Sequence, residues 1–458
     1  MRSREAVTSV IKAYDVRGVV DQDIDAEFIY EVGQAFGALM REEGATRVAV
    51  GHDMRPSSPE LSQAFAKGVN AQGVDVLALG LTSTDQLYFA SGEFDCPGAM
   101  FTASHNPAEY NGIKLCRSGA RPVGQASGLA QIVDMLVEGV PSYEGAHGSI
   151  TEEDTLAAYG AFLRGLVDLS GIRHLKVAVD AANGMAGHTV PEVFKGLNID
   201  IEPLYFELDG TFPNHEANPL DPKNLTDLQA FTPKVGADIG LAFDGDADRC
   251  FVVDELGQPV SPSAICAIVA QRYLQEHPGA TIIHNLITSK TVPEIIQEHG
   301  GTAVRTRVGH SFIKAQMAEH KAVFGGEHSA HYYFQEFFNA DSGILAALHV
   351  LAALGQQDRP LSELMASYTR YAASGEINSK LASAEQQQER AQAVIDAFRD
   401  RAASIDDLDG YTVELAQSPA WFNVRASNTE PLLRLNVEAP TEDEVASLVE
   451  EILAIIRA

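Results

Sequence analysis

The same order of predicted elements occurs three times along this chain, and that recurrence constrains the fold more than any other feature. Each time, a short apolar run leads into a polar loop, a helical pattern and a second apolar run; the three blocks begin at Arg47, Lys176 and Thr281. Strands that alternate with helices in this way predict βαβ units with parallel strands. Repeats of this size predict tandem domains rather than a solenoid.

A further apolar run in each block ends in a distinctive polar loop. The loops read T-A-S-H-N-P from Thr102, D-G-D-A-D-R from Asp244 and G-E-H-S-A-H from Gly326. Open α/β sheets place their ligand sites beyond the carboxyl ends of the strands. We therefore expect the three loops to meet in one cleft between domains, where ligand sites are common.

The C-terminal part of the chain has a different order of elements. A predicted helix at 385–398 precedes several short strands, and a helix at 442–456 follows them, which is typical of an α+β domain. The predicted fold class is α/β, with three tandem mixed-sheet domains and a smaller C-terminal α+β domain around a central cleft. A chain of 458 residues is too long for one core. The expected domains cover residues 1–152, 153–256, 257–370 and 371–458.

The charge of the chain excludes several classes of partner. With 63 acidic against 33 basic residues the net charge is −30, which argues against nucleic acid or an anionic membrane. An anionic small substrate would need a local basic pocket. The four cysteines have no paired spacing and the N-terminus lacks an apolar signal segment, so we expect a cytoplasmic protein. We also expect no membrane span, because no apolar run is long enough.

Ser104 is the candidate nucleophile. The apolar run Ala99–Phe101 leads into its loop, His105 is its neighbour, and Pro107 fixes the backbone behind it. We interpret Ser104 as a residue that carries phosphate covalently. A hydrolase triad is disfavoured, because adjacent side chains do not form its oriented Ser-to-His hydrogen bond and no G-x-S-x-G elbow is present.

Three aspartates form a candidate metal site. Asp244, Asp246 and Asp248 are spaced i, i+2, i+4, and carboxylates so close together repel one another unless a cation lies among them. Oxygen ligands favour a hard cation, Mg²⁺ or else Ca²⁺ or Mn²⁺. An EF-hand is excluded, because its sixth position requires Gly and here it is Arg249. Arg249 is placed to hold a phosphate beside the ion.

A second candidate phosphate site follows near the C-terminus. The stretch R-A-S-N-T-E-P carries a guanidinium, two hydroxyls and an amide, from Arg425, Ser427, Asn428 and Thr429. A guanidinium fork with hydroxyl donors suits a phosphate dianion. Taken alone, the same residues are better explained as an ordinary turn.

Five motifs, in this order, resemble those of the α-D-phosphohexomutases. They are T-A-S-H-N-P, N-G-I-K, D-G-D-A-D-R, G-E-x-S-x-H and R-x-S-N-T-E-P, and the similarity runs from Tyr14 to Pro431. Within the family the chain is most similar to the bacterial phosphomannomutase/phosphoglucomutase branch. The resemblance implies an isomerase that interconverts hexose 6-phosphate and hexose 1-phosphate, of mannose and also of glucose. Its implied partner is a small phosphosugar, and its implied state is a monomer or weak homodimer.

The resemblance also implies the cofactors and the residue roles. Mg²⁺ would be held by the phosphate on Ser104 and by the three aspartates, and a hexose 1,6-bisphosphate would serve as activator and intermediate. The implied catalytic residues are Ser104, His105, Lys114, Arg249, His331, Tyr14 and Arg17. The implied substrate-binding residues are Lys290, His310, Glu327, Ser329, Arg425, Ser427, Asn428 and Thr429. We expect Lys114 to be desolvated on its apolar strand, with a lowered pKa.

The chain departs from the family pattern at positions that affect specificity. Ala426 stands where the family commonly has Pro, and the sugar loop reads G-E-H-S-A-H rather than G-E-M-S-G-H. Phosphoglucosamine mutase is the nearest alternative, although its metal loop is usually D-G-D-G-D-R and here Ala247 replaces the second Gly. A non-catalytic sugar-phosphate binding protein is the other alternative, but it would predict a missing Ser104 or a broken set of aspartates.

Overall fold

The computed structural model describes residues 2–427 and 432–458, without the side chains of 310 and 311. The chain divides into two compact units, one of residues 1–260 with 329–362 and the other of 261–328 with 363–458. Each unit is described by itself.

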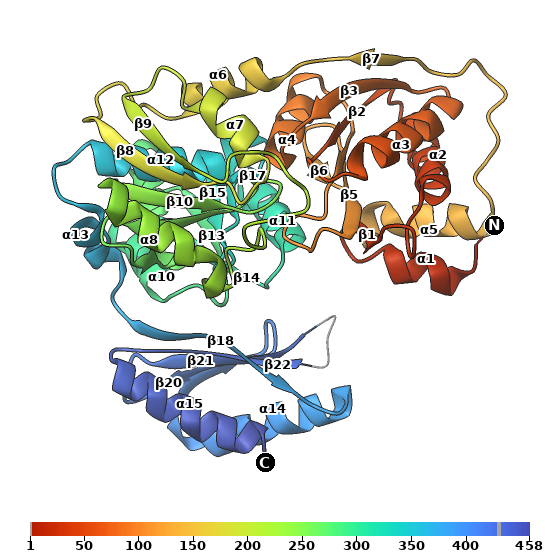
Figure 1. Ribbon diagram of the computed structural model, residues 1–458. Helices are drawn as coiled ribbons and strands as arrows, with labels where there is room; N and C mark the ends of the chain where they lie inside the picture. Colours follow the sequence, from red (N-terminus) through yellow and green to blue (C-terminus); the bar gives the residue numbers. More distant parts are fainter. Residues whose placement is uncertain (1, 428–431) are drawn as a thin grey trace. The chain divides into compact units, whose positions relative to one another are not determined.

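The first sheet of unit one has the strand order β1-β5-β4-β2-β3-β7, with β6 beside β5 (Figure 1). β2 pairs in parallel with β3 and β4, whereas β5 is antiparallel to β4 and β1. The strands are β1 (Val16–Val19), β2 (Arg47–His52), β3 (Asp75–Leu81), β4 (Gly98–Phe101), β5 (Tyr110–Arg117), β6 (Arg121–Pro122) and β7 (Ile150–Glu152). The helices are α1 (Arg4–Val10), α2 (Ala26–Glu42), α3 (Ser58–Ala71), α4 (Thr84–Glu93) and α5 (Leu129–Glu138).

Apolar residues on both faces of this sheet explain why helices cover both. Val48 and Val50 of β2 and Phe101 of β4 belong to the core shared with α1, α2, α3 and α5. The intervening Ala49 and Met100 pack with residues of α4 on the opposite face. This alternation follows from the two-residue repeat of a strand. This sheet is held in place because helices cover both of its faces. The loops that follow the carboxyl ends of β2 and β4 therefore lie side by side.

The second sheet of unit one has the order β12-β11-β10-β8-β9. β9, β8 and β10 are parallel, and β10 continues through the Asp244–Arg249 loop into antiparallel β11. The strands are β8 (Leu175–Asp180), β9 (Ile199–Leu204), β10 (Ile239–Phe243), β11 (Cys250–Asp254) and β12 (Pro259–Val260), and the helices are α6 (Leu156–Leu166), α7 (Ala186–Val193) and α8 (Thr226–Val235). The segment 329–362 adds β16 (Tyr332–Phe334), β17 (Ala340–Asp341) and the buried helix α12 (Gly343–Gly355).

Unit two contains two groups of strands with their helices, a parallel α/β group and an antiparallel α+β group. In the first, β13 pairs in parallel with β14 and β15. In the second, the order is β18-β22-β21-β20-β19, and α14 and α15 cover one face of the sheet (Figure 1). The strands are β13 (Thr281–Asn285), β14 (Thr302–Thr306), β15 (Phe324–Gly326), β18 (Ala372–Lys380), β19 (Ala402–Asp406), β20 (Tyr411–Leu415), β21 (Trp421–Ala426) and β22 (Leu432–Ala439). The helices are α9 (Pro262–Glu276), α10 (Thr291–Glu298), α11 (His310–His320), α14 (Ala384–Phe398) and α15 (Glu442–Ile456), and α13 (Leu361–Met365) precedes β18.

The predicted fold class is confirmed: three α/β sheets with their helices are followed by a smaller α+β sheet with its helices. Each predicted strand–helix–strand block is present. The sequence analysis did not anticipate β18 and β19, the two edge strands of the last sheet. No helix in the described part of the chain is long and apolar enough to cross a membrane.

Candidate active site

Ser104 lies at the tip of the loop that follows β4, in an unusual backbone conformation. Its φ is +50°, in the left-handed region, and its side chain is buried, with 5% of the residue exposed. Its Oγ donates a hydrogen bond to Oδ2 of Asp244 at 2.8 Å and lies 3.1 Å from Nδ1 of His105. The candidate nucleophile and the candidate metal loop therefore form one site.

The aspartate loop connects β10 to β11, both fully buried, so its carboxylates are held away from bulk water. Gly245 lies directly against the Ser104 loop: a Cβ built on it would lie 2.4 Å from the Ser104 carbonyl oxygen. Only a residue without a side chain permits that approach. The contact fixes the two loops against each other and presents Asp244 to Ser104.

The donor set of this loop fits a hard divalent cation. Asp244, Asp246 and Asp248 are all buried, and each offers an oxygen within 4.8 Å of the other two. Oδ1 of Asp246 and Oδ1 of Asp248 are buried and have no hydrogen-bond partner among the described residues. Buried carboxylate oxygens are costly unless paired or bound to a metal. An all-oxygen set of this kind suits Mg²⁺.

Lys114 and Arg249 supply positive charge to the aspartates. Lys114 lies on β5 opposite Met100 of β4, and its Nζ donates to Oδ2 of Asp246 at 2.7 Å and Oδ2 of Asp248 at 2.5 Å. Arg249 donates from Nε to Oδ2 of Asp244 at 2.8 Å. These two residues offset part of the negative charge of the three aspartates.

The expected lowering of the Lys114 pKa is wrong for this structure. Burial acts to lower the pKa of Lys114, but the carboxylates of Asp246 and Asp248 outweigh it and raise that pKa well above its usual value. Lys114 is thus held in its charged form. Burial likewise opposes ionisation of Asp246 and Asp248, yet the nearby Lys114 ammonium keeps both of their pKa values below the usual range. Burial raises the pKa of Asp244 above its usual range, although the positive charge of Arg249 acts to lower it.

His105 is held neutral beside Ser104. Burial, together with the positive charges of Arg249 and Arg17, lowers the pKa of His105 to about 2. Nη2 of Arg249 donates to Nδ1 of His105, which is therefore the unprotonated ring nitrogen. His105 thus orients the guanidinium of Arg249 toward Ser104, whose Oγ is 3.3 Å from the same Nη2.

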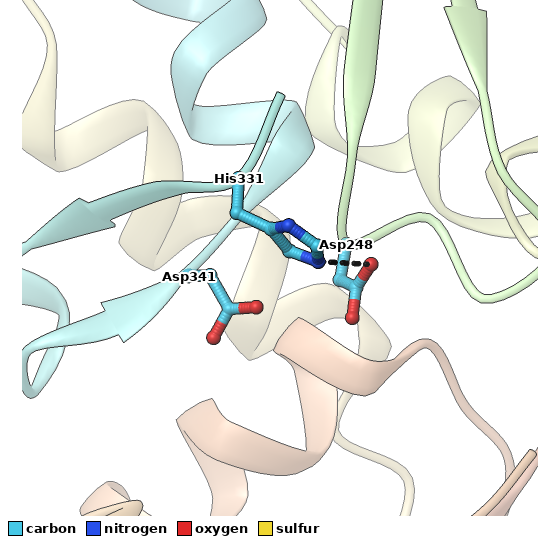
Figure 2. A group of neighbouring side chains, drawn as sticks. All are labelled: Asp248, His331 and Asp341. Atoms are coloured by element: carbon cyan, nitrogen blue, oxygen red, sulfur yellow. Dashed lines mark ion pairs between the residues drawn. The ribbon is translucent and has the colours of Figure 1, made fainter. Parts of the chain in front are cut away.

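His331 completes the site from the third loop (Figure 2). Its ring lies between the carboxylates of Asp248 and Asp341, with Nε2 3.9 Å from Oδ1 of Asp248. Nδ1 lies 3.0 Å from the Ser329 hydroxyl, and the ring stacks on Tyr333. His331 is partly exposed and lies beside Asp248, a candidate metal ligand.

Arg17 lies at the edge of the Ser104 loop. Arg17 is on β1 opposite Gly112, which belongs to the N-G-I-K motif. It donates from Nη1 to the side-chain oxygen of Asn106 at 2.7 Å and forms an ion pair with Asp15. Tyr14 is half-buried in the bend before β1.

The remaining predicted residues lie in unit two. Lys290 is the N-cap residue before helix α10, and its backbone N–H donates to Glu438 at 2.8 Å. Glu327 is buried and accepts from the Gly309 backbone at 3.2 Å and from Asn285 at 3.3 Å. His310 opens α11, but its side chain is outside the described part.

The predicted phosphate loop is described only in part. Arg425 donates to Glu376 at 2.6 Å, and the Ser427 hydroxyl accepts from Arg434 at 3.3 Å. Asn428 and Thr429 lie outside the described residues.

Thr84 and Arg55 also belong to the site, and the sequence pattern predicts neither of them. Thr84, at the start of α4, donates from Oγ1 to Oδ2 of Asp246 at 2.6 Å and from its N–H to the Asp246 carbonyl at 3.1 Å. Arg55, in the loop after β2, donates to backbone carbonyls of the Ser104 loop. β2 and β4 are parallel neighbours, so their carboxyl ends share one edge of the sheet; that placement is the signal that could have revealed Arg55.

Comparison with known proteins agrees with this geometry. Residues 8–137, 157–257 and 261–371 match the phosphoglucomutase/phosphomannomutase alpha/beta/alpha domains I, II and III, and residues 376–455 match the C-terminal domain of that family. A phosphomannomutase of Escherichia coli is 37% identical over 97% of this chain and 98% of its own length. A phosphoglucomutase of Neisseria meningitidis is 36% identical over 98% of this chain and 97% of its own length.

The solved structures give the same result. The crystal structure of a phosphoglucomutase/phosphomannomutase family protein from Burkholderia thailandensis superposes with a TM-score of 0.90 at 32% identity, covering 100% of this chain and 98% of that one. Together with the Ser104–Asp244 site, these matches show that the chain belongs to the phosphoglucomutase/phosphomannomutase family.

Proposed function

We propose that this protein is a phosphohexomutase that interconverts hexose 6-phosphate and hexose 1-phosphate, acting on mannose and on glucose. Ser104 would carry the phosphoryl group, and a hexose 1,6-bisphosphate would be both the intermediate and the activator. The proposal includes the domain boundaries 1–152, 153–256, 257–370 and 371–458, and a cytoplasmic location, which four buried free thiols favour.

One observation carries the proposal: the buried Ser104 hydroxyl donates to a carboxylate of the three-aspartate loop. The carboxylates of that loop also contact the positively charged side chains of Arg249 and Lys114. Ser104 Oγ is 2.8 Å from Asp244, which Arg249 also contacts, while Lys114 bridges Asp246 and Asp248. Phosphoryl transfer requires charge neutralisation and alignment more than covalent assistance. A serine in such a setting is suited to bear a phosphate rather than an acyl group.

The proposed reaction has two matched half-reactions. In the first, the bond between Oγ of phosphorylated Ser104 and phosphorus breaks, and phosphorus bonds to a hydroxyl oxygen of the sugar phosphate. The sugar hydroxyl gives up one proton, for which His331 is the acceptor we assign. Ser104 Oγ takes up one proton from solvent, so that the number of protons is unchanged once His331 releases its own. Ser104 then has the hydroxyl that donates to Asp244. In the second half-reaction the bisphosphate, turned end over end, returns its other phosphoryl group to Ser104.

Mg²⁺ would be held by Asp244, Asp246, Asp248 and the phosphate on Ser104, and when bound it supplies positive charge to the transferring group. Arg249 and Lys114 are also positively charged and would stabilise the same transferring group. Arg249 is fixed at both ends by Asp244 and His105, so its guanidinium is aimed at Ser104 before substrate arrives. Lys114, charged in this structure, is an electrostatic partner of the phosphoryl group rather than a base.

For substrate binding we propose Lys290 and His310 toward the sugar phosphate, Glu327 and Ser329 toward the sugar hydroxyls, and Arg425, Ser427, Asn428 and Thr429 for the non-reacting phosphate. The buried Glu327, with its acceptor oxygen held by two N–H donors, suits a sugar hydroxyl. Arg425 and Arg434 both contact Glu376, which places two guanidinium groups near one loop, as a phosphate dianion requires.

The test is an isomerisation assay of the Mg²⁺-loaded protein with mannose 1-phosphate, glucose 1-phosphate and glucosamine 1-phosphate, each with a trace of hexose 1,6-bisphosphate. The proposal predicts turnover of the mannose and glucose substrates above that of glucosamine 1-phosphate. Preference for glucosamine 1-phosphate would favour the phosphoglucosamine alternative. Failure with all three, together with measurable binding, would replace the enzyme by a sugar-phosphate binding protein.

A further inference from the structure

Arg55 is a buried arginine whose donors converge on the Ser104 loop. Its exposed fraction is 0%. Nη2 donates to the carbonyls of Ser104 at 2.9 Å and Asn106 at 2.7 Å, and Nη1 donates to those of Pro107 at 2.7 Å and Tyr110 at 2.9 Å. Nε donates to Asp53 at 3.2 Å. A guanidinium has five N–H donors, so each of them has an acceptor here.

The conformation of this loop depends on a cation at its centre. Four carbonyl oxygens point at one place, and their dipoles repel one another unless a positive group lies between them. Ser104, with φ of +50°, is one of the four, and its carbonyl also packs against Gly245 of the aspartate loop. A non-glycine residue held in the left-handed region requires surroundings that determine its conformation, and here Arg55 provides them.

Arg55 is itself held rigidly. Asp53 accepts from the Arg55 backbone at 3.0 Å and from the Ser58 hydroxyl at 2.6 Å, and Asn111 donates to the same hydroxyl at 2.9 Å. On another side, the Phe212 ring lies 5.1 Å from the guanidinium carbon, and Gly210 packs against the Arg55 backbone. We call Arg55 and the four carbonyls that it binds the Arg55 clamp. The segment 210–212, which belongs to the domain of the second sheet in the same unit, therefore shields this clamp from solvent.

We propose that Arg55 is a positioning residue for phosphoryl transfer. Arg55 binds the carbonyl of the nucleophile itself and three carbonyls that follow it in the chain, and so sets Ser104 Oγ toward Asp244 and the metal loop. The inference rests on the function proposed above. Arg55 touches no atom that reacts. Displacing a reacting group by about 1 Å can reduce turnover by on the order of 10²-fold, so a loop held at four points matters for rate.

The test compares Arg55→Lys with the matched control Arg117→Lys. Arg117 lies on β5 in the same sheet, and its guanidinium pairs with Glu43 instead of the Ser104 loop. Lysine keeps the charge but has three donors on one nitrogen and cannot span four carbonyls. We measure kcat and KM with Mg²⁺ and hexose 1,6-bisphosphate, and backbone hydrogen exchange over residues 102–110.

The expected result is faster exchange in that segment, a kcat lowered by at least about 10-fold and a KM within about 2-fold of wild type, with Arg117→Lys unchanged in all three. Unchanged exchange would overturn the clamp, and faster exchange with an unchanged kcat would overturn its role in transfer. If the wild-type protein turns over no hexose phosphate, the proposed function fails while the exchange arm still decides the clamp.

A second variant guards against loss of folding. Asp53→Asn keeps Arg55 and the buried volume but removes an acceptor of the guanidinium. If Arg55→Lys does not fold, Asp53→Asn should still show faster exchange over residues 102–110 and a lowered kcat. Both effects should be smaller than those expected for Arg55→Lys. Wild-type exchange and wild-type kcat in folded Asp53→Asn would then contradict the proposal.

Discussion

Ser104 Oγ donates to Oδ2 of Asp244 at 2.8 Å, although 140 positions separate the two residues. The two loops meet because each follows the carboxyl end of a buried strand in the same unit, and because Gly245 lets their backbones touch. This one hydrogen bond joins the candidate nucleophile to the candidate metal loop.

Replacement of Ser104 should abolish turnover without unfolding the protein. Ser104→Ala removes the only atom that would carry the phosphoryl group, so activity should fall by on the order of 10³-fold or more. The control Ser62→Ala removes a half-buried hydroxyl that bonds to Pro59 in α3, and it should retain activity. Thermal melts and isomerase assays of both variants test this. Wild-type turnover in Ser104→Ala would refute the nucleophile.

Thr84 should tune metal affinity without being a ligand. Its hydroxyl orients Asp246 Oδ2, and loss of such an outer partner typically weakens metal binding by about 10–100-fold. Calorimetric titration of Thr84→Val with Mg²⁺ should show that loss. Thr189→Val is the matched control, because Thr189 is a buried helical threonine that bonds to the Met185 carbonyl in α7. Equal Mg²⁺ affinities in the two variants would contradict the assignment.

Lys114 should matter most to stability when metal is absent. In metal-free protein, Lys114→Met leaves Asp246 and Asp248 without their shared cation, at a cost of about 3 kcal/mol. Saturating Mg²⁺ should recover part of that loss, since it provides another cation for the same carboxylates. The melting temperatures of Lys114→Met and of Lys176→Met, whose lysine pairs with half-exposed Glu202, are compared with and without Mg²⁺. A deficit that Mg²⁺ leaves unaltered would argue against a shared role.

His215 should make stability depend on pH. Burial opposes protonation of His215, but the adjacent Asp180 carboxylate outweighs it and raises the His215 pKa. A raised pKa in the folded state means that protonation stabilises the fold. That contribution is fully present below the unfolded-state pKa of about 6.5 and is lost as pH rises through the folded-state value. The melting temperature of His215→Gln should therefore fall below that of wild type at pH 5.5 and approach it at pH 8.5. A constant gap would show that Asp180 does not hold a charged imidazole.

The sequence could predict those parts of the site whose chemistry lies in local spacing. Three aspartates at alternate positions indicate a cation, and apolar runs before polar loops indicate strand ends, so the loops of Ser104 and Asp244 could be anticipated. Edge strands β18 and β19 were not, because half or more of their residues are polar or exposed and lack a clear two-residue repeat.

Long-range electrostatics and backbone acceptors could not be predicted. The pKa of Lys114 depends on two carboxylates 132 and 134 positions away, which no local pattern reveals. Arg55 acts on carbonyl oxygens, which every residue possesses, so its partners have no sequence signature.

The most direct test of a phosphorylated Ser104 is the mass of the intact protein. After incubation with glucose 1,6-bisphosphate and Mg²⁺, we predict one added phosphoryl group, mapped by peptide analysis to Ser104 and lost on exposure to glucose 1-phosphate, a monophosphate that accepts it. An enzyme that turns over hexose phosphates while Ser104 stays unmodified, or that carries the phosphoryl group on another residue, would contradict it.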